Sequence, residues 1–138
     1  GPMMTHVLLV EDSLDRVQWF ATALDRLGRT YDVTHDPDTA IRWLAEGRVY
    51  ADLYLDHDLG HEPRTGRDVA TWLIAHPDVL PMLMITTHTV NTVSGPKIEQ
   101  ELLAAGRFAR WLPFTQLVAE RPGWSRMGGI NGWVMLHG

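Results

Sequence analysis

Carboxylate and imidazole side chains crowd the stretch DLYLDHDLGH, which runs over Asp52–His61. Residues 53–55 have the apolar composition of a buried strand, and Asp56, His57 and Asp58 follow it directly. Carboxylates bind hard divalent cations, an ionised aspartate can act as a nucleophile, and imidazole transfers protons near neutral pH. The stretch leaves three roles open for Asp56, which are metal ligand, nucleophile and structural acid.

Two other apolar runs, residues 6–10 and 81–85, also end in polar side chains. Glu11 and Asp12 follow the first run, and Thr86, Thr87, His88 and Asn91 follow the second. In an open parallel sheet the carboxyl ends of the strands line the crevice where ligands bind. We therefore expect these side chains to converge with Asp56 although they are far apart in the sequence.

Five strand-like runs alternate with five helical patterns along the chain. We expect strands at 6–10, 31–35, 53–55, 81–85 and 108–112, and helices that begin near Ser13, Asp36, Gly66, Ser94 and Thr115. The helical spacers are long enough for right-handed crossovers between parallel strands. The predicted fold class is therefore α/β, with a five-stranded parallel sheet covered by helices on both faces.

The chain of 138 residues divides into two predicted parts. Residues 3–120 carry the alternating pattern and form one α/β domain. Residues 121–138 hold Trp124 and Trp133 among five glycines, with no clear helical or strand period. We expect this segment to be a C-terminal extension that packs on or beside the domain.

Composition limits the classes of function. A net charge of −5 argues against broad binding to nucleic acid, which needs a basic face, but it is compatible with a small phosphate-containing ligand. The absence of cysteine excludes disulfides and cysteine zinc sites. No apolar run approaches the ~20 residues of a membrane helix, so we expect no membrane association and a cytoplasmic location.

From Met4 to Ala119 the chain resembles the receiver domains of response regulators, which have a flavodoxin-like fold. The matching features are Glu11 and Asp12 after the first strand, Asp56 after the third, Leu59, Gly66, and Thr86 or Thr87 after the fourth. The resemblance implies that the acids hold Mg²⁺, that Asp56 accepts a phosphoryl group and that the hydroxyl senses it.

One receiver feature is missing from the chain. Receivers have a lysine before a proline at the end of the fifth strand, where this chain has Leu112-Pro113, and its single lysine, Lys97, lies on another element. An aspartyl phosphate would lose a charged partner without that ammonium group. This argues against switching by phosphorylation.

The departures from the receiver pattern resemble a second family. LDHDL over residues 55–59, Thr65-Gly66, and the H-x-x-N pattern from His88 to Asn91 are similar to the cyclic-phosphate-processing receiver domains of bacteria and their phages. This resemblance implies chemistry on a cyclic phosphate, in a nucleotide or at an RNA end.

The candidate metal site is a set of oxygen ligands suited to Mg²⁺ or Mn²⁺. Its predicted members are Glu11, Asp12, Asp56 and Asp58. The alternative for the acids is a role in helix capping or an exposed position on the surface. Asp58 has the further alternative of contributing only its backbone carbonyl, as the receiver pattern implies.

The predicted catalytic residues are His88, Asn91, Asp56 and His57, and the predicted substrate-binding residues are Thr87, Arg64 and Arg67. His88 would transfer a proton and Asn91 would hydrogen-bond a phosphate oxygen or a sugar hydroxyl. The alternative for His88 is a loop histidine tied to the backbone, and for His57 a core residue bonded to a carbonyl.

The sequence therefore favours a metal-dependent phosphoesterase acting on a cyclic phosphate. The competing hypothesis is a signalling module, either a phosphoacceptor at Asp56 or a receiver-like domain that binds a partner constitutively. A zinc site from His57 and His61 is a weaker alternative, because their spacing lies on a loop rather than on one helical face. The tail with its tryptophans could in addition form a homodimer contact.

Overall fold

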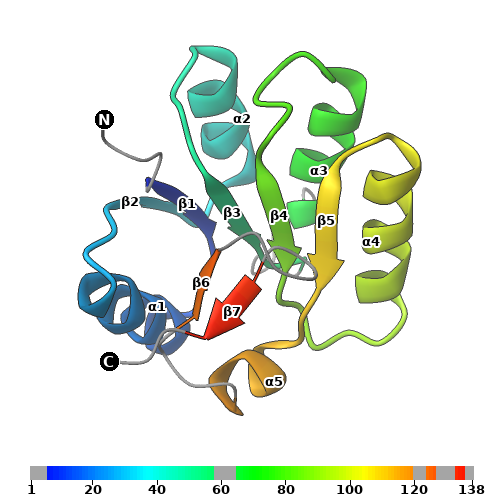
Figure 1. Cartoon of the computed structure of the whole chain (residues 1–138). Coiled ribbons are helices and arrows are strands. Elements are labelled where there is room, and N and C mark those ends of the chain that lie inside the picture. The colour runs from blue at the N-terminus through cyan, green and yellow to red at the C-terminus, as the bar shows by residue number, and fades with distance from the viewer. Residues whose placement is uncertain (1–5, 58–64, 120–123, 127–132, 136–138) are drawn as a thin grey trace.

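The computed structural model describes residues 6–57, 65–119, 124–126 and 133–135 (Figure 1). The strands are β1 (Val7–Val10), β2 (Tyr31–Thr34), β3 (Asp52–Leu55), β4 (Met84–Thr87), β5 (Phe108–Trp111), β6 (Trp124–Arg126) and β7 (Trp133–Met135). The helices are α1 (Leu14–Arg26), α2 (Pro37–Ala45), α3 (Gly66–Ala75), α4 (Ser94–Ala104) and α5 (Phe114–Ala119).

The main sheet has five parallel strands in the order β2-β1-β3-β4-β5. Helices α1 and α5 lie on one face of the sheet, and α2, α3 and α4 lie on the other (Figure 1). Each face has its own cluster of buried apolar side chains. The predicted α/β class, with a parallel sheet covered on both faces in a flavodoxin-like receiver fold, is confirmed.

Capping side chains start the two helices that flank the site. The Ser13 hydroxyl accepts a hydrogen bond from the Arg16 amide at 3.4 Å at the start of α1. Thr65 and Asp68 form a reciprocal capping box at the start of α3. Helix α1 therefore begins four residues after β1 ends, and α3 begins against the carboxyl end of β3, where Gly66 lies next to the Asp56 carbonyl.

The fourth strand begins three residues later than the sequence pattern predicts. Leu80 has a φ of 44°, and the Leu83 amide donates to the Leu80 carbonyl at 3.0 Å, so the first half of the apolar run 81–85 is a turn. Thr86 belongs to the strand, because a β-branched side chain fits a buried pleated surface. The predicted boundary at 81–85 is wrong, and His88 becomes the first residue beyond β4.

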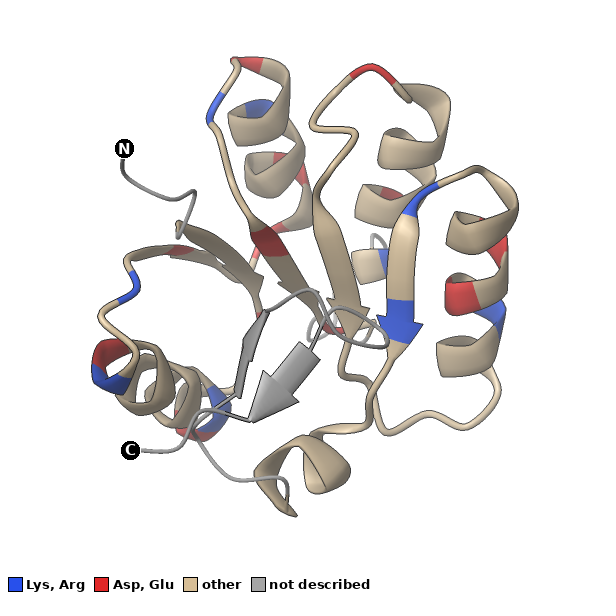
Figure 2. Cartoon of the chain, viewed as in Figure 1, with Lys and Arg blue, Asp and Glu red and all other residues tan. Residues whose placement is uncertain are grey.

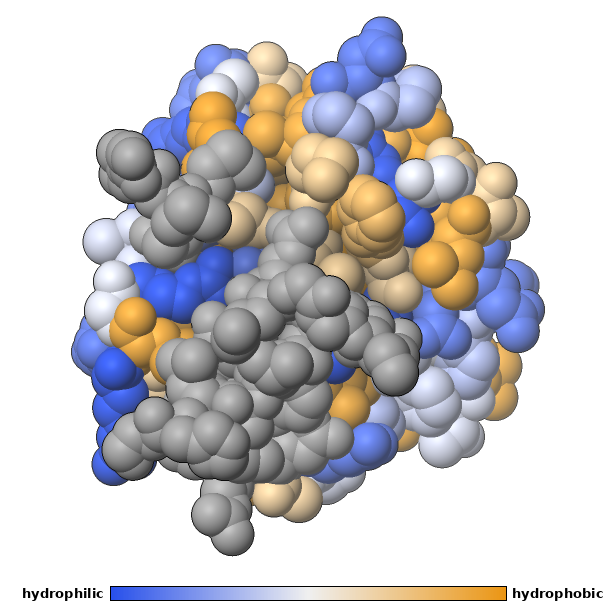
Figure 3. Space-filling model, in the orientation of Figure 1, coloured by the Kyte–Doolittle hydropathy of each residue, from blue (hydrophilic) through white to orange (hydrophobic). Residues whose placement is uncertain are grey.

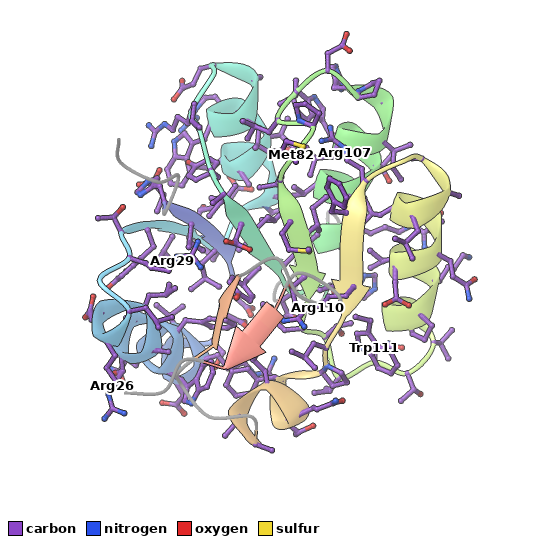
Figure 4. The ribbon with its side chains drawn as sticks, in the orientation of Figure 1. Arg26, Arg29, Met82, Arg107, Arg110 and Trp111 are labelled. Atoms are coloured by element: carbon purple, nitrogen blue, oxygen red, sulfur yellow. The ribbon has the colours of Figure 1, made fainter. Side chains whose placement is uncertain are left out.

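Arg107 fixes the turn that precedes β4 (Figure 4). Its buried guanidinium donates five hydrogen bonds to four backbone carbonyls, those of Leu73, His76, Val79 and Leu80, at 2.7 to 3.3 Å. Burial lowers the pKa of Arg107. The side chain supplies donors to the end of α3 and to the loop after it, which carry carbonyls without helical partners.

Charged side chains also lie on the sheet itself. Strand β3 begins with an acid and β5 carries an arginine, which appear as coloured segments in otherwise uncharged strands (Figure 2). Asp52 is buried and pairs with Arg29 at 2.5 Å. Apolar surface on the viewed face gathers over the amino ends of β4 and β5 (Figure 3), where Met82 and Phe108 are exposed.

Strands β6 and β7 pair in antiparallel fashion within the C-terminal segment, seen between α1 and α5 in Figure 1. The sequence has no pattern that predicted this pair. The division into a domain at 3–120 and an extension at 121–138 stays a prediction. Among the described residues no helix is long and apolar enough to span a bilayer.

Candidate functional site

Three neighbouring strands end in the same row of the sheet. Val10 of β1 pairs with Leu55 of β3, and Leu55 pairs with Thr87 of β4. The next residue along each strand therefore lies in the following row, side by side with the others. These three residues are Glu11, Asp56 and His88.

The side chains of this row meet on the α1/α5 face. Each of the three offers one potential ligand atom, and these atoms lie within 4.8 Å of one another. All three residues are buried, with exposed fractions of 1% for Glu11, 3% for Asp56 and 0% for His88. The His88 ring contacts the ring of Phe20, which projects from α1, at a centroid distance of 5.0 Å. Glu11 and His88, which are 77 residues apart in the sequence, therefore lie side by side with Asp56, as the sequence predicted.

Glu11 is held as a carboxylate. Its Oε2 atom accepts hydrogen bonds from the amides of Asp12 at 2.9 Å and Ser13 at 3.1 Å, and its Oε1 atom lies 2.7 Å from His88 Nε2. Burial raises the pKa of Glu11, but the hydrogen bond and charge of His88, the Ser13 amide and the Arg16 guanidinium outweigh it and lower the pKa to about 2. Glu11 is therefore ionised across the physiological pH range.

His88 is neutral at pH 7. Burial lowers the pKa of His88 below its usual value, and this effect exceeds the opposing hydrogen bond to Glu11. Because Glu11 is a carboxylate, His88 donates its proton from Nε2, and Nδ1 carries the lone pair. Within the described part of the chain, His88 Nδ1 is buried and has no hydrogen-bond partner.

Arg16 brings a positive charge to the two carboxylates. Its Nη1 atom lies 3.7 Å from Glu11 Oε1 and 3.6 Å from Asp56 Oδ2. The guanidinium also lies over the Phe114 ring, 5.1 Å from its centroid. The side chain of Arg16 is 30% exposed, whereas the carboxylates have almost no exposed surface. The Arg16 side chain therefore lies between the buried carboxylates and the solvent.

Gly66 lets helix α3 begin against the backbone of the site. A Cβ atom on this residue would lie 1.7 Å from the Asp56 carbonyl oxygen, and the Gly66 amide donates to the His57 carbonyl at 3.0 Å. A side chain at this position would push the helix away from Asp56. The close approach to the Asp56 carbonyl therefore explains why this position, which is part of the family resemblance, is a glycine.

The other predicted metal ligands are placed differently or lie outside the described residues. Asp12 is exposed, and its side chain is absent from the only group of potential metal ligands found among the described residues. Asp58 falls in the range 58–64, which is not described. The structure therefore brings Glu11 and Asp56 together with His88, and adds an imidazole to the predicted oxygen ligands.

Asn91 and Arg67 have protein partners. The Asn91 Oδ1 atom accepts hydrogen bonds from the amides of Val93 and Ser94, both at 2.9 Å, at the start of α4. Arg67 donates to Glu101 of α4 at 2.6 Å. Asn91 can therefore offer a ligand only its NH₂ group, and the positive charge of Arg67 is already paired with a carboxylate.

The remaining predicted residues lie near the row. Thr87 is buried, and its hydroxyl has no hydrogen-bond partner among the residues that the structure describes. Side chains alternate along a strand, so Thr87 points to the α2–α4 face and His88 to the opposite one. His57 is half-buried beside Asp56, and Arg64 lies outside the described residues.

The row continues to Leu112 on the far side of His88. Thr87 pairs with Trp111, and the Leu112 amide donates to the Thr87 carbonyl at 3.0 Å. The predicted correspondence of Leu112 with the receiver lysine agrees with this register. The position is apolar and buried, so the positive charge of the site comes from α1 instead.

Arg16 was missed by the sequence analysis. Its signal was weak, because it consists only of a basic residue in the first turn of the helix that follows an acidic strand end. Such a residue can point to solvent or back to the sheet, and the sequence does not distinguish the two. The contacts with Glu11 and Asp56 depend on the rotation of α1 about its axis.

The donor set fits a divalent cation. Glu11, Asp56 and His88 each offer one potential ligand atom, and these atoms lie within 4.8 Å of one another. Carboxylate oxygens suit Mg²⁺ and Mn²⁺, and an imidazole ligand favours transition metals over Mg²⁺. Glu11 and Asp56 would hold the ion, and His88 could join them only by giving up the Nε2 proton that it donates to Glu11.

A parallel sheet in this strand order, with acids at its carboxyl edge, defines the class of receiver domains. Solved structures share this fold. The signal receiver domain of a LuxO repressor protein from Vibrio parahaemolyticus aligns with a TM-score of 0.62 and 19% identity over 85% of this chain and 88% of that one. A CheY-like receiver domain protein from Methanospirillum hungatei aligns with a TM-score of 0.63 and 13% identity over 87% and 94%.

A third similar structure contains a phosphorylated aspartic acid. It is a response regulator from Burkholderia pseudomallei with a phosphorylated aspartic acid, a calcium ion and citrate, similar with a TM-score of 0.61 and 18% identity over 83% of this chain and 65% of that one. At these identities the likeness shows the fold.

The sequence comparison identifies the family. The profile described as "Cyclic-phosphate processing Receiver domain" matches residues 8–104. The chain belongs to this family. No curated protein matches the sequence.

Proposed function

We propose that this receiver domain is a metal-dependent phosphoesterase that opens a cyclic phosphate in a small nucleotide or at an RNA end. The observation that carries the proposal is the buried His88, in the row of Asp56 and hydrogen-bonded to Glu11 at 2.7 Å. Receivers have a lysine at the end of the fifth strand to pair with the phosphoryl group; the register here has Leu112 at that position, and the positive charge near Asp56 comes from Arg16 instead. The row thus favours proton transfer over phosphate storage.

Glu11 sets the tautomer of His88. The Nε2–H group donates a hydrogen bond to the Glu11 carboxylate, which leaves Nδ1 as the basic atom, as in other carboxylate–histidine pairs. Nδ1 can then accept a proton from water or return one to the leaving sugar oxygen. Phe20 and Phe114 flank the ring and limit the access of bulk water.

Asp56 and Glu11 supply the carboxylates that bind a cation. A divalent ion, Mg²⁺ or Mn²⁺, would neutralise charge on the phosphoryl oxygens when bound. Gly66 leaves room for the Asp56 backbone carbonyl, and the Asp56 carboxylate lies 3.6 Å from Arg16. Both acids are buried, so their charges act in a medium of low dielectric constant.

The test is hydrolysis of 2′,3′-cyclic and 3′,5′-cyclic nucleotides in the presence of Mg²⁺ or Mn²⁺. We expect His88→Gln to lose activity by about 10²-fold or more, the usual contribution of a general acid or base, and Asp56→Asn to lose activity because it removes a carboxylate that binds the cation. Asp78→Asn changes an exposed acid in the turn before β4 and serves as the control. Full activity in the His88 and Asp56 variants would remove the assignment.

A phosphoacceptor in a signalling pathway is the second candidate. The observation that favours it is the position of Asp56 at the end of β3, in a fold shared with a response regulator that has a phosphorylated aspartic acid. Incubation with a small phosphodonor followed by intact mass measurement decides between the two. A phosphate adduct that is absent in Asp56→Asn would favour signalling.

A further inference from the structure

We propose that Arg16 is an exchangeable cation of the site. In the metal-free protein it neutralises Glu11 and Asp56, and when a divalent ion binds it turns from the carboxylates to a phosphate group of the ligand. The second half of this statement rests on the proposed function, because it needs a phosphate-containing ligand. The first half rests only on the contacts of Arg16.

The contacts of Arg16 with the acids are close enough for attraction and too long for hydrogen bonds. The distances of 3.6 and 3.7 Å exceed the 2.7 to 3.2 Å of a normal N–H···O bond. By contrast, Glu11 makes short bonds with His88 and with the backbone. Glu11 is therefore fixed by other partners, and the guanidinium can leave without releasing it.

The anchoring of Arg16 permits such a movement. Its backbone amide caps α1 through Ser13, so its Cα is fixed, while 30% of its side chain is exposed to solvent. The Phe114 ring on α5 gives the guanidinium an aromatic surface outside the carboxylates. A change of side-chain rotamer can move the charge without a change in the fold.

Repulsion between two cations favours the movement. Glu11 and Asp56 offer two carboxylates, and the single guanidinium of Arg16 lies within 4 Å of both. A divalent ion on the same oxygens compensates both charges. A guanidinium that stayed within 4 Å of those oxygens would then repel the ion.

The displaced guanidinium suits a phosphate. Its planar donors match two phosphate oxygens at once, which a lysine does not do. In the row of the site, the position after β5 holds Leu112, which cannot supply this charge. Arg67, another predicted phosphate ligand, is paired with Glu101. Arg16 is therefore the described arginine best placed to pair with an oxyanion over the acids.

The experiment measures two affinities in the full chain. Titration with Mn²⁺, followed by electron paramagnetic resonance of the free ion, gives the affinity for the metal. Calorimetric titration with inorganic phosphate at saturating Mn²⁺ gives the affinity for the oxyanion. Both are measured for wild type, Arg16→Ala and Arg16→Lys. Arg26→Ala is the matched control, because Arg26 points outward at the far end of the same helix (Figure 4).

We expect opposite shifts in Arg16→Ala. Mn²⁺ should bind about tenfold more tightly, because the competing cation is gone, and phosphate about tenfold more weakly, each equal to about 1.4 kcal/mol. Arg16→Lys should lie between wild type and Arg16→Ala in both affinities. Arg26→Ala, with the same change of net charge, should leave both within about twofold of wild type.

Unchanged or weaker Mn²⁺ binding in Arg16→Ala overturns the proposal, as does equal tightening in Arg26→Ala, which would show a general charge effect. Circular dichroism confirms that each variant is folded, and Arg16→Lys carries the test if Arg16→Ala is not. The affinities are independent of turnover. If Arg16→Ala binds Mn²⁺ more tightly but the wild-type protein hydrolyses no cyclic nucleotide, the proposal for Arg16 stands and the proposed phosphoesterase activity is rejected.

Discussion

Substitution of Glu11 by glutamine tests the electrostatics of the site through the pH dependence of stability. Glu11 has a pKa of about 2 in the folded protein, against an ordinary value of 4.5. A carboxyl group with a lowered folded pKa stabilises the fold above its unfolded pKa and loses this effect as the pH falls through the folded value. The window of loss is therefore between pH 4.5 and about 2.

The size of the effect follows from this difference in pKa. One pKa unit corresponds to about 1.4 kcal/mol, so ionised Glu11 contributes about 3 kcal/mol at pH 7 and about 1 kcal/mol at pH 3. Glutamine has no such ionisation. The difference in free energy of unfolding between wild type and Glu11→Gln should therefore shrink as the pH falls.

The assay is urea unfolding at pH 7, 5 and 3, monitored by circular dichroism. Glu46→Gln, which changes an exposed glutamate just after α2, controls for the loss of one charge and should remain close to wild type at each pH. His88 also protonates as the pH falls, and it does so at a lower pH in Glu11→Gln than in wild type, because the Glu11 carboxylate opposes the lowering of the His88 pKa. A difference between wild type and Glu11→Gln that stays constant from pH 7 to pH 3 would refute the assignment of Glu11 as a strongly stabilised carboxylate.

Three further substitutions test the packing around the site. Gly66→Ala should lower the free energy of unfolding by about 1 to 3 kcal/mol, because its Cβ meets the Asp56 carbonyl at 1.7 Å; it should also weaken Mn²⁺ binding, and an unchanged thermal midpoint would contradict the clash. Arg107→Met should cost about 3 kcal/mol in urea unfolding, since it leaves buried carbonyls without donors; equal loss in the exposed Arg26→Met would point to charge instead. Asp52→Asn should cost about 3 to 5 kcal/mol by leaving Arg29 buried without its carboxylate, while a double replacement of both by apolar residues should restore most of this in the same assay.

The fold could be predicted because local signals agree with one another. Ser13 and Asp36 were recognised as helix starts, and both side chains accept hydrogen bonds from the first turn of their helices. Apolar runs between the helices fit strands that are buried on both faces. The fourth strand was misplaced because Leu80 and Pro81 continue the apolar run while the backbone turns. At this point the apolar residues predict a buried segment, but they do not indicate whether it is a strand or a turn.

The site could be predicted in part, since strand ends follow from the fold and side-chain contacts do not. Asp56 was placed correctly at the end of β3. Strand β4 ends at Thr87, two residues beyond the predicted end at Ile85, so His88 and not one of the threonines before it enters the row. The bond between His88 and Glu11 depends on that register, because a shift of one residue turns a side chain to the other face.

The two candidate functions require a positive charge at different places in the site. In a relay the phosphoryl group remains on Asp56, and a cation fixed at the end of β5 stabilises it; here that place is Leu112, buried in the apolar cluster with Phe20. The cation on α1 is instead half-exposed and loosely paired. A loosely held arginine stabilises a product poorly but can follow a ligand that enters and leaves. The arrangement therefore favours turnover of a phosphate ligand over its storage on Asp56.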